Sequence, residues 1–147
     1  MSSTLATELT DELAAAVERL MPQLTSHCPP TRDELAALLA SPCSYLLLAR
    51  HPENGPIVGM ATLIVYILPT GLRARLEDVV VDESARGLGQ GEALTQRALE
   101  LAAEDGAESV ALSSGPQREA ANRLYQKMGF VPWESNHYRY WLRKSGG

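Results

Sequence analysis

The sequence contains few cysteines and few aromatic residues, and it lacks a long uninterrupted hydrophobic run. Its two cysteines, Cys28 and Cys43, form neither a CxxC pair nor a Cys/His spacing typical of metal sites, so we expect no disulfide framework and no metal. The longest apolar run, residues 57–68, is broken by Gly59 and Thr62 and is shorter than the roughly 20 residues of a membrane-spanning helix. The start of the chain also lacks the basic and apolar regions of a secretory signal. These absences predict a cytoplasmic protein that does not associate with membranes.

The charge balance is acidic, with 13 Lys and Arg against 18 Asp and Glu and a net charge of −5. A general nucleic-acid binder needs a broad basic face, so we expect no nucleic-acid partner. Residues 113–147 differ from the rest, because they hold six basic and only two acidic side chains. Most of the aromatic residues lie there too: Tyr125, Phe130, Trp133, Tyr138, Tyr140 and Trp141. A chain of 147 residues predicts one domain over residues 1–147.

Hydrophobic periodicity predicts a mixed α/β domain. Thr10 and Thr31 are each placed as N-caps of amphipathic helices, the second with a capping box closed by Glu34. The expected elements in chain order are helices at 11–20 and 32–40, strands at 45–49, 57–68 and 73–81, a helix from the glycine-rich turn to Gly106, a strand at 109–113, a helix that Pro116 opens and Gly129 ends, and one or two closing strands within 131–142. A weaker pattern places a short strand within residues 3–8. This order favours an antiparallel meander with added helices over a regular βαβ array.

The strand at 73–81 changes character along its length, from polar to three successive valines. Strict alternation places one set of side chains on one face: Arg73, Arg75, Glu77, Val79 and Val81. It places the other set on the opposite face: Leu76, Asp78 and Val80. Such a strand leads from a solvated cleft into the core.

A glycine-rich turn, Arg86-Gly-Leu-Gly-Gln-Gly91, joins this strand to the next helix. Glycines leave no Cβ, so several backbone N–H groups can point into one concavity at the helix N-terminus, where the helix dipole also favours an anion. A dinucleotide fingerprint is excluded because Glu92 stands at its last glycine position, and a P-loop is excluded because the terminal Gly-Lys-Ser/Thr is absent. The turn therefore indicates either an anion site or a tight turn in which the glycines serve packing.

Two linked motifs resemble those of the GNAT superfamily of acyl-CoA-dependent N-acetyltransferases. Residues 76–82, Leu-Glu-Asp-Val-Val-Val-Asp, followed by the glycine-rich turn, are similar to the family's fourth strand and pyrophosphate loop. Residues 121–125, Ala-Asn-Arg-Leu-Tyr, followed by Met128-Gly-Phe130, are similar to its second signature. The resemblance implies a mixed central sheet of six to seven strands flanked by about four helices, with strands 4 and 5 splayed apart.

The resemblance also implies acetyl-CoA as co-substrate. Backbone N–H groups of the glycine-rich turn would hold the pyrophosphate, and the last residues of the preceding strand would pair with the pantetheine arm as if it were another strand. The residues assigned to the coenzyme in this way are Val79, Val80, Val81, Arg86, Gly87, Leu88, Gly89, Gln90, Gly91 and Asn122. One departure from the family pattern is Arg118, which stands where the family often has Asn and leaves the role of that position open.

Two residues are candidates for the transfer chemistry. An alkyl amine attacks a thioester only when neutral, so a base must remove a proton from a group with a pKa near ~10. Glu77 is the candidate base, with the alternative that it binds a cationic substrate or pairs with Arg75. Tyr125 is the candidate acid for the leaving thiolate, with the alternative that it extends the hydrophobic stripe of its helix.

The chemical class of the acceptor is predicted from charged residues of the strand at 73–81 and from one tryptophan. Arg73 and Arg75 suit a phosphate or carboxylate, Glu77 suits an amine, and Trp133 could line the acceptor pocket or lie in the sheet or a dimer interface. The predicted reaction is direct attack of a primary amine on acetyl-CoA in a ternary complex. We expect the acceptor to be a small molecule, an amino sugar phosphate or an amino-acid-like metabolite. A homodimer is a further expectation. The alternatives are a protein N-terminal or lysine acetyltransferase and a non-catalytic acetyl-CoA sensor or partner module.

Overall fold

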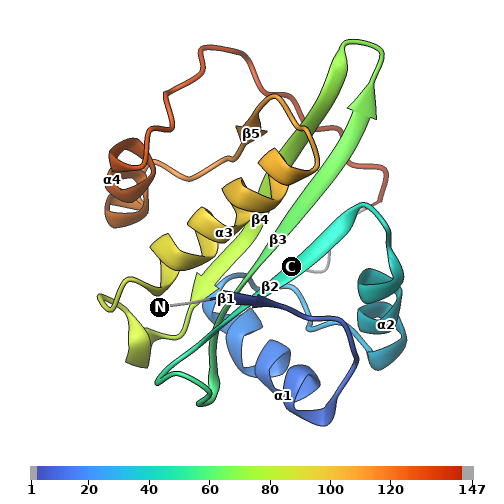
Figure 1. The fold of residues 1–147 in the computed structure, drawn as a ribbon, viewed down its shortest axis with the longest axis vertical. Helices are drawn as coiled ribbons and strands as arrows, with labels where there is room; N and C mark the ends of the chain where they lie inside the picture. Colours follow the sequence, from blue (N-terminus) through green and yellow to red (C-terminus); the bar gives the residue numbers. More distant parts are fainter. Residues whose placement is uncertain (1–2, 144–147) are drawn as a thin grey trace. The chain divides into compact units, whose positions relative to one another are not determined.

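The computed structural model describes residues 3–143 and divides into two compact units, Met1–Leu112 and Ser113–Gly147. The first unit contains a five-stranded sheet and most of the helices (Figure 1). The second unit contains one helix, α4 (Glu119–Lys127), and an extended chain that follows it. The single domain over residues 1–147 stays a prediction.

The sheet has the strand order β1-β2-β3-β4-β5, so strands that are neighbours in the chain are neighbours in space. Its strands are β1 (Ser3–Leu5), β2 (Ser44–Arg50), β3 (Ile57–Leu68), β4 (Gly71–Val81) and β5 (Val110–Ala111). The first four pair antiparallel, and β5 pairs parallel to β4. The predicted meander is confirmed, and β3 has the bounds that the sequence predicts.

The helices begin where the sequence places their caps. The helical segments are α1 (Asp11–Leu20), the 3₁₀ turn η1 (Met21–Gln23), α2 (Arg32–Ala40), the 3₁₀ turn η2 (Glu83–Ala85) and α3 (Gln90–Glu104). The Thr31 hydroxyl accepts from the Glu34 N–H, and the Glu34 carboxylate accepts from the Thr31 N–H, which completes the predicted capping box. Among residues 3–143, no helix is both long enough and apolar enough to cross a membrane.

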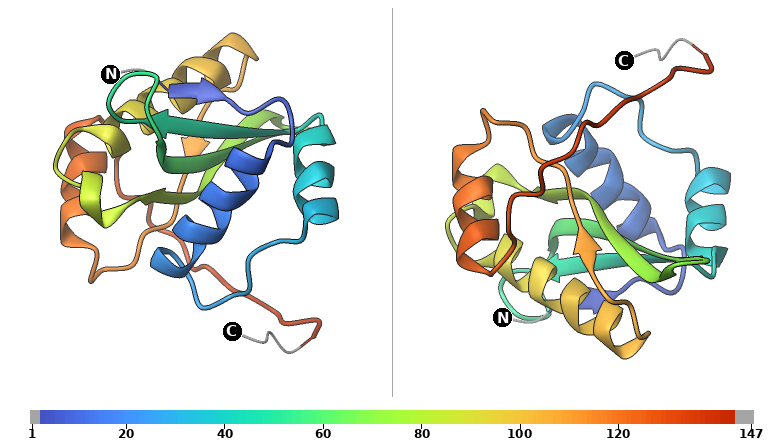
Figure 2. Two further views of the ribbon diagram at one scale, coloured as in Figure 1. Left: turned by 90° about the horizontal axis from the view of Figure 1, so that it is seen from below. Right: turned by 90° about the horizontal axis from the view of Figure 1, so that it is seen from above.

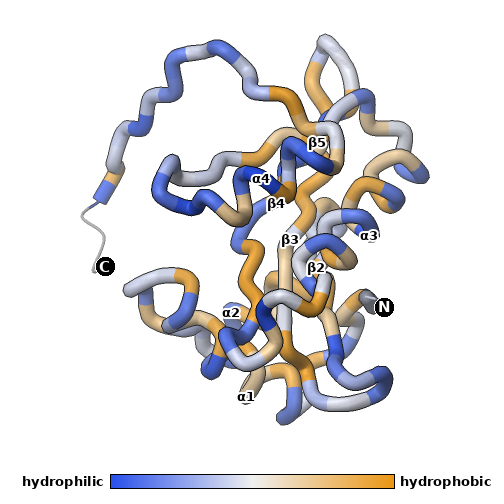
Figure 3. The backbone as a smooth tube through the Cα atoms, turned by 90° about the vertical axis from the view of Figure 1, so that its left-hand side faces the viewer, coloured by the Kyte–Doolittle hydropathy of each residue, from blue (hydrophilic) through white to orange (hydrophobic). Residues whose placement is uncertain are grey.

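Helices cover both faces of the sheet in the first unit. The views in Figure 2 place α1 and α2 on one face and α3 on the other. The core on the α3 face includes Leu47, Leu63, Leu76 and Leu94, and the core on the α1/α2 face includes Leu20, Leu35, Leu46, Met60 and Val80. Figure 3 shows the resulting concentration of hydrophobic residues along the strands. Because β2, β3 and β4 contribute to both cores, side chains that point to either face of these strands are buried.

The predicted count of six to seven strands is wrong, because the described part of the chain forms five. Residues 131–142, expected to hold one or two closing strands, form none. The large side chains of this segment are exposed, with Trp133 at 85% and Tyr138 at 84%. Alternation and β-branched or aromatic content give a segment the capacity to pair, but the ladder also requires a partner edge, and local sequence does not encode one.

A β-bulge interrupts the pairing of β3 with β4. Met60 pairs with Val80 and Thr62 pairs with Glu77, so one residue of β3 faces two of β4, one of them Asp78. Asp78 has φ +53°, a left-handed backbone conformation that only Gly, Asn and Asp adopt readily. The extra residue ends the strict alternation of the strand at this point.

The bulge reverses which face the following side chains occupy. Before it, Leu76 lies in the core on the α3 face, and after it Val79 and Val81 pack against that same core. Val80 lies instead in the core on the α1/α2 face. The predicted sharing of one face by Glu77, Val79 and Val81 is therefore wrong, because alternation continues only as long as the register is constant.

The bulge yields a stability prediction from a matched pair of variants. Asp78→Gly and Asp78→Ala both remove the carboxylate and differ only in the Cβ atom. We expect the Gly variant to have a free energy of unfolding about 1 kcal/mol higher than that of the Ala variant, because the Cβ penalty at positive φ falls on Ala alone. Urea denaturation of the two variants measures the difference, and equal midpoints would show that the left-handed conformation carries no cost here.

Candidate functional site

The turn before α3 has the backbone shape that the glycines predict. Gly87 has φ +81° and Gly89, the N-cap of α3, has φ +80°. A Cβ added to Gly87 would meet no atom within 4 Å. Glycine is therefore favoured there by its positive φ and not by a lack of room for a side chain. No side chain caps the N-terminus of α3, and the backbone N–H groups at the start of a helix favour an anion.

Charged groups flank this turn. The Arg86 side chain folds back, and its Nε donates to the Val81 carbonyl at 3.1 Å at the end of β4. Asp82 accepts from the backbone N–H and the hydroxyl of Ser84, and these hydrogen bonds hold the pKa of that carboxyl below its usual value. Asp82 also forms an ion pair with Arg19 at 3.6 Å. The Asp82 carboxylate is therefore held by contacts to its own turn and to Arg19.

The outer edge of β4 is only partly used. β5 pairs with β4 at Ala74 and Arg75 alone, so from Leu76 to Val81 that edge carries no strand in the part of the chain that the structure describes. The open edge runs directly into η2 and the glycine-rich turn. An extended ligand with amide groups could therefore add to β4 as a further strand and reach the turn with its anionic end.

Gln90 is a polar group without a protein partner in this region. It is the first residue of α3 and only 1% exposed, and neither its Oε1 nor its Nε2 has a hydrogen-bond partner among the described residues. The open β4 edge, the two left-handed glycines and this buried amide together fit a ligand that carries both phosphates and amides, as coenzyme A does.

Polar side chains of β4 before the bulge lie on the face opposite Leu76. Arg75 Nε donates to Glu77 Oε1 at 2.9 Å, and Arg73 forms an ion pair with Glu108 at 3.2 Å. The side chains of the two arginines are about one third exposed, at 31% for Arg73 and 33% for Arg75. The structure therefore brings the three predicted acceptor residues of β4 to one face, without Val79 and Val81.

Asp78, at the bulge, carries a perturbed carboxyl. Burial raises its pKa, the neighbouring Glu77 carboxylate raises it further, and His27 opposes both effects. His27 belongs to the loop between η1 and α2, and its Nδ1 lies 2.7 Å from the Thr25 hydroxyl. A loop that follows α1 thus contributes to the electrostatics of the bulge, which sequence alternation did not indicate.

In the second unit, α4 carries the residues of the second motif. Asn122 Nδ2 donates to the Gly115 carbonyl at 3.0 Å, which ties the helix to the preceding loop. Tyr125 is 6% exposed and meets Phe130 edge to face, with ring centroids 5.7 Å apart. Burial raises the pKa of Tyr125, and the charge of Arg118 partly opposes the shift. Tyr125 is therefore a protonated hydroxyl in an apolar setting, and Trp133, the predicted acceptor residue, is exposed.

The bulge at Asp78 and the burial of Gln90 were not predicted from the sequence. Asp78 interrupts the apolar series Leu72, Ala74 and Leu76, but such a break does not by itself distinguish a bulge from a change in the surroundings of a regular strand. Gln90 has a usable signal, since it lies four residues before Leu94 and eight before Ala98 on the buried stripe of α3. A polar residue on a buried stripe calls for a partner.

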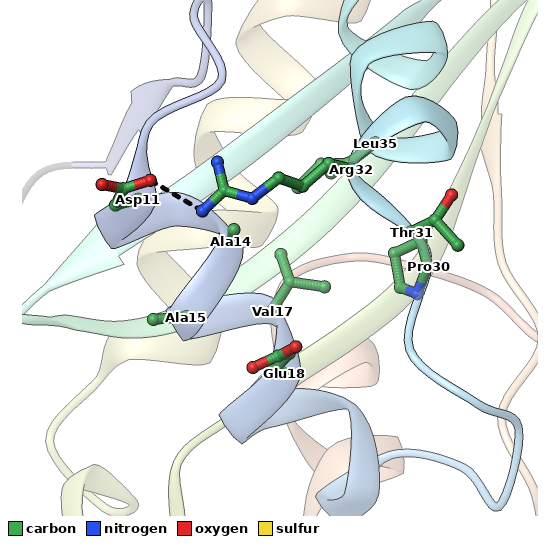
Figure 4. A pocket seen from close by; sticks show the side chains of 9 residues that line it. All are labelled: Asp11, Ala14, Ala15, Val17, Glu18, Pro30, Thr31, Arg32 and Leu35. Atoms are coloured by element: carbon green, nitrogen blue, oxygen red, sulfur yellow. Dashed lines mark hydrogen bonds and ion pairs between the residues drawn. The ribbon is translucent and has the colours of Figure 1, made fainter.

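A separate pocket of about 210 Å³ lies between α1 and α2 (Figure 4). The Asp11–Arg32 ion pair, at 2.6 Å, spans part of its rim, and Val17 and Leu35 belong to its lining. None of the coenzyme, acceptor or catalytic residues predicted from the sequence lines it. Within residues 3–143, no group of three His, Cys, Asp or Glu side chains is placed to hold a metal ion.

The model of the acetyltransferase (GNAT) family matches residues 8–130, so the chain belongs to this family. The resemblance and the α/β fold class are confirmed. The chain is 34% identical over 114 residues to glucosamine 6-phosphate N-acetyltransferase 1 of Oryza sativa subsp. japonica, which covers 75% of this chain and 66%, just under two thirds, of that protein.

Two further similarities bear on the fold and the acceptor. Aminoalkylphosphonate N-acetyltransferase of Salmonella typhimurium is 30% identical over 136 residues, covering 91% of this chain and 84% of that protein. The crystal structure of an acetyltransferase from Trypanosoma brucei superposes with a TM-score of 0.75 at 26% identity, covering 95% of this chain and all of that one.

The environment of Tyr125 gives a pH prediction. Because burial disfavours the phenolate, the pKa of Tyr125 is higher in the folded chain than in the unfolded chain. Its contribution to stability is therefore fully present below pH 10.0, the ordinary tyrosine value, and is lost as the pH rises through the folded pKa. We expect the difference in 295 nm absorbance between wild type and Tyr125→Phe to titrate above pH 10.0. A midpoint at or below that value would contradict the assignment.

Proposed function

We propose that this protein is an acetyl-CoA-dependent N-acetyltransferase. The observation that carries the proposal is the open edge of β4 from Leu76 to Val81, which leads directly into the left-handed glycine turn before α3. A parallel strand that leaves its neighbour after two residues creates a place for an extended ligand beside a site for its phosphates. Family membership supports the same reading.

Coenzyme binding is assigned to backbone groups. The N–H groups of residues 88–91 bind the pyrophosphate at the start of α3, and Arg86 adds positive charge beside them. The backbone of Val79–Val81 would pair with the pantetheine arm, and Asn122 is assigned to the coenzyme from the family motif alone. When bound, the coenzyme supplies an acetyl group activated as a thioester.

The carboxylates at the bulge are assigned to the acceptor amine. Glu77 is the proposed base, since a carboxylate can accept a proton from the ammonium while its Oε1 accepts from Arg75. The contact with Arg75 equally supports the alternative that Glu77 binds and orients the amine. As the base, Glu77 takes the ammonium proton and leaves a neutral nitrogen to attack the thioester carbonyl. As a binding residue, it only orients the amine, and the proton passes to another acceptor such as water.

Tyr125 is assigned to the leaving sulfur. Its raised pKa keeps the phenol protonated at neutral pH, so it acts as a hydrogen-bond donor. A thiolate has a reference pKa of about 8.5 and a phenol about 10, so full proton transfer is unfavourable, but donation to the developing charge lowers the barrier. The support for this role is the motif on α4 together with the buried hydroxyl.

We propose a small primary amine that carries a phosphate or phosphonate as the acceptor. Two relatives are named for such acceptors, glucosamine 6-phosphate and an aminoalkylphosphonate. Arg73 and Arg75 stand on the same face as Glu77, so an anionic group and an amine of one small molecule could be bound together. Exposed Trp133 is a further candidate for acceptor contact. A cytoplasmic location and a homodimer stay predictions from the sequence.

Coenzyme binding is tested with two glycines of the same backbone conformation. Gly87 and Gly106 have φ +81° and +88°, and a Cβ on either would meet nothing within 4 Å. We expect both Ala variants to lose stability, but only Gly87→Ala to bind acetyl-CoA more weakly, by roughly tenfold, because only Gly87 shapes the anion site. Isothermal titration calorimetry measures both affinities. If Gly87→Ala binds as tightly as Gly106→Ala, the turn does not hold the coenzyme.

Activity and acceptor class are tested by thiol release from acetyl-CoA. We expect turnover with glucosamine 6-phosphate or 2-aminoethylphosphonate, and at least tenfold higher KM for the matched amines without the anionic group, glucosamine and ethylamine. Tyr125→Phe should lower kcat by roughly 100-fold while acetyl-CoA affinity stays nearly unchanged. Unaltered turnover in this variant would remove Tyr125 from the mechanism. Binding of acetyl-CoA without turnover of any amine, peptide amines included, would favour the sensor alternative.

A further inference from the structure

The most unusual polar group in the first unit is the side chain of Gln90. It is 1% exposed, and both its amide oxygen and its amide nitrogen lack a hydrogen-bond partner in residues 3–143. The other buried polar side chain on α3, that of Thr95, is satisfied, because its Oγ1 donates to the Gly91 carbonyl at 2.8 Å. Of these two buried polar side chains of α3, only that of Gln90 lacks a partner.

The position of Gln90 on α3 shows where its amide points. Gln90 shares the buried face of the helix with Leu94 and Ala98, and that face lies on the sheet. Leu94 sits over the β3–β4 ladder, since a Cβ on Gly59 would lie 3.2 Å from Leu94 Cδ1 and 3.2 Å from the Val80 carbonyl oxygen. Gln90 lies one helical turn closer to the start of α3, the end of the helix that follows β4 and the glycine-rich turn.

The end of β4 is also where its outer edge is open. Val79 and Val81 turn toward the α3 side after the bulge, and no strand pairs with their outer edge in the described chain. A buried primary amide offers two donors and two acceptor lone pairs and is costly to leave unpaired. An apolar side chain at this position would avoid that cost, so the amide requires a partner from outside the described residues.

We propose that Gln90 is a coenzyme-binding side chain that hydrogen-bonds an amide of the pantetheine arm. The inference rests on the proposed function and adds a side-chain contact to a site otherwise built from backbone groups. Each amide of the arm carries one donor and one acceptor, so a single Gln amide can satisfy both and be satisfied in return. The amide has no partner among residues 3–143, and a bound coenzyme would supply one.

The test compares two ligands and two variants of the full chain. The ligands are coenzyme A and adenosine 3′,5′-bisphosphate, which lacks the arm. Gln90→Met keeps the size of the side chain and removes its hydrogen bonds, with Gln90→Leu as a second apolar variant. Thr95→Val is the matched control, because it removes a buried hydroxyl that already has a partner.

We expect the Gln90 variants to melt at a higher temperature than wild type without ligand. They should bind coenzyme A about 5- to 10-fold more weakly and bind adenosine 3′,5′-bisphosphate with unchanged affinity. Thr95→Val should bind both ligands as wild type does. Unchanged coenzyme A affinity in the Gln90 variants, or equal weakening for both ligands, would overturn the inference while leaving the proposed function intact. Failure of wild type to bind coenzyme A would overturn the proposed function, and this inference with it.

Discussion

One extra residue in β4 determines how the candidate site is organised. At Asp78 the strand takes a left-handed backbone step, and two residues of β4 face one residue of β3. Glu77 before this step and Val79 and Val81 after it would share one face in a regular strand, because side chains alternate. The bulge places them on opposite faces of the sheet instead. Without the bulge, alternation would place Glu77 on the same face as Val79 and Val81, so a charged side chain and apolar ones would compete for the same surroundings. The backbone conformation of one residue thus allows a single strand to provide a charged surface and an apolar one.

The division of β4 matches two different chemical needs. An acceptor amine with an anionic group requires charged side chains that keep contact with water, and Arg75 and Glu77 on the α1/α2 face are partly exposed. A long ligand that adds to the strand edge requires unpaired backbone groups and apolar neighbours, and Val79 and Val81 beside α3 meet that need. The bulge lies between the two regions, where an acyl group would pass from one ligand to the other.

The sequence predicted those features that depend on local physics. Capping by Thr10 and Thr31, the bounds of β3 and the left-handed glycine turn each follow from a few neighbouring residues. The bulge could not be predicted, because a left-handed Asp has no local signature as glycine does, and alternation assumes a constant register. The closing strands at 131–142 were predicted wrongly for a related reason, since pairing depends on a distant edge. The charged groups of β4 and their grouping on one face were predicted, but the separation of Val79 and Val81 from them was not.

Gln90 shows why the remaining errors concentrate at the site. Packing alone favours an apolar residue there, as on the rest of the buried stripe of α3, and the sheet beneath it is otherwise hydrophobic. A chain that is consistent at every level would place leucine at this position, so the amide marks a point where a requirement other than folding determined the residue. The same reasoning applies to Asp78, where glycine would fit the backbone better. Both residues flank the open end of β4, at its bulge and at the start of the next helix. At both positions the residue differs from the one that stability alone would favour. Two such independent differences at the same end of one strand are stronger grounds for a ligand site than either sequence motif taken alone.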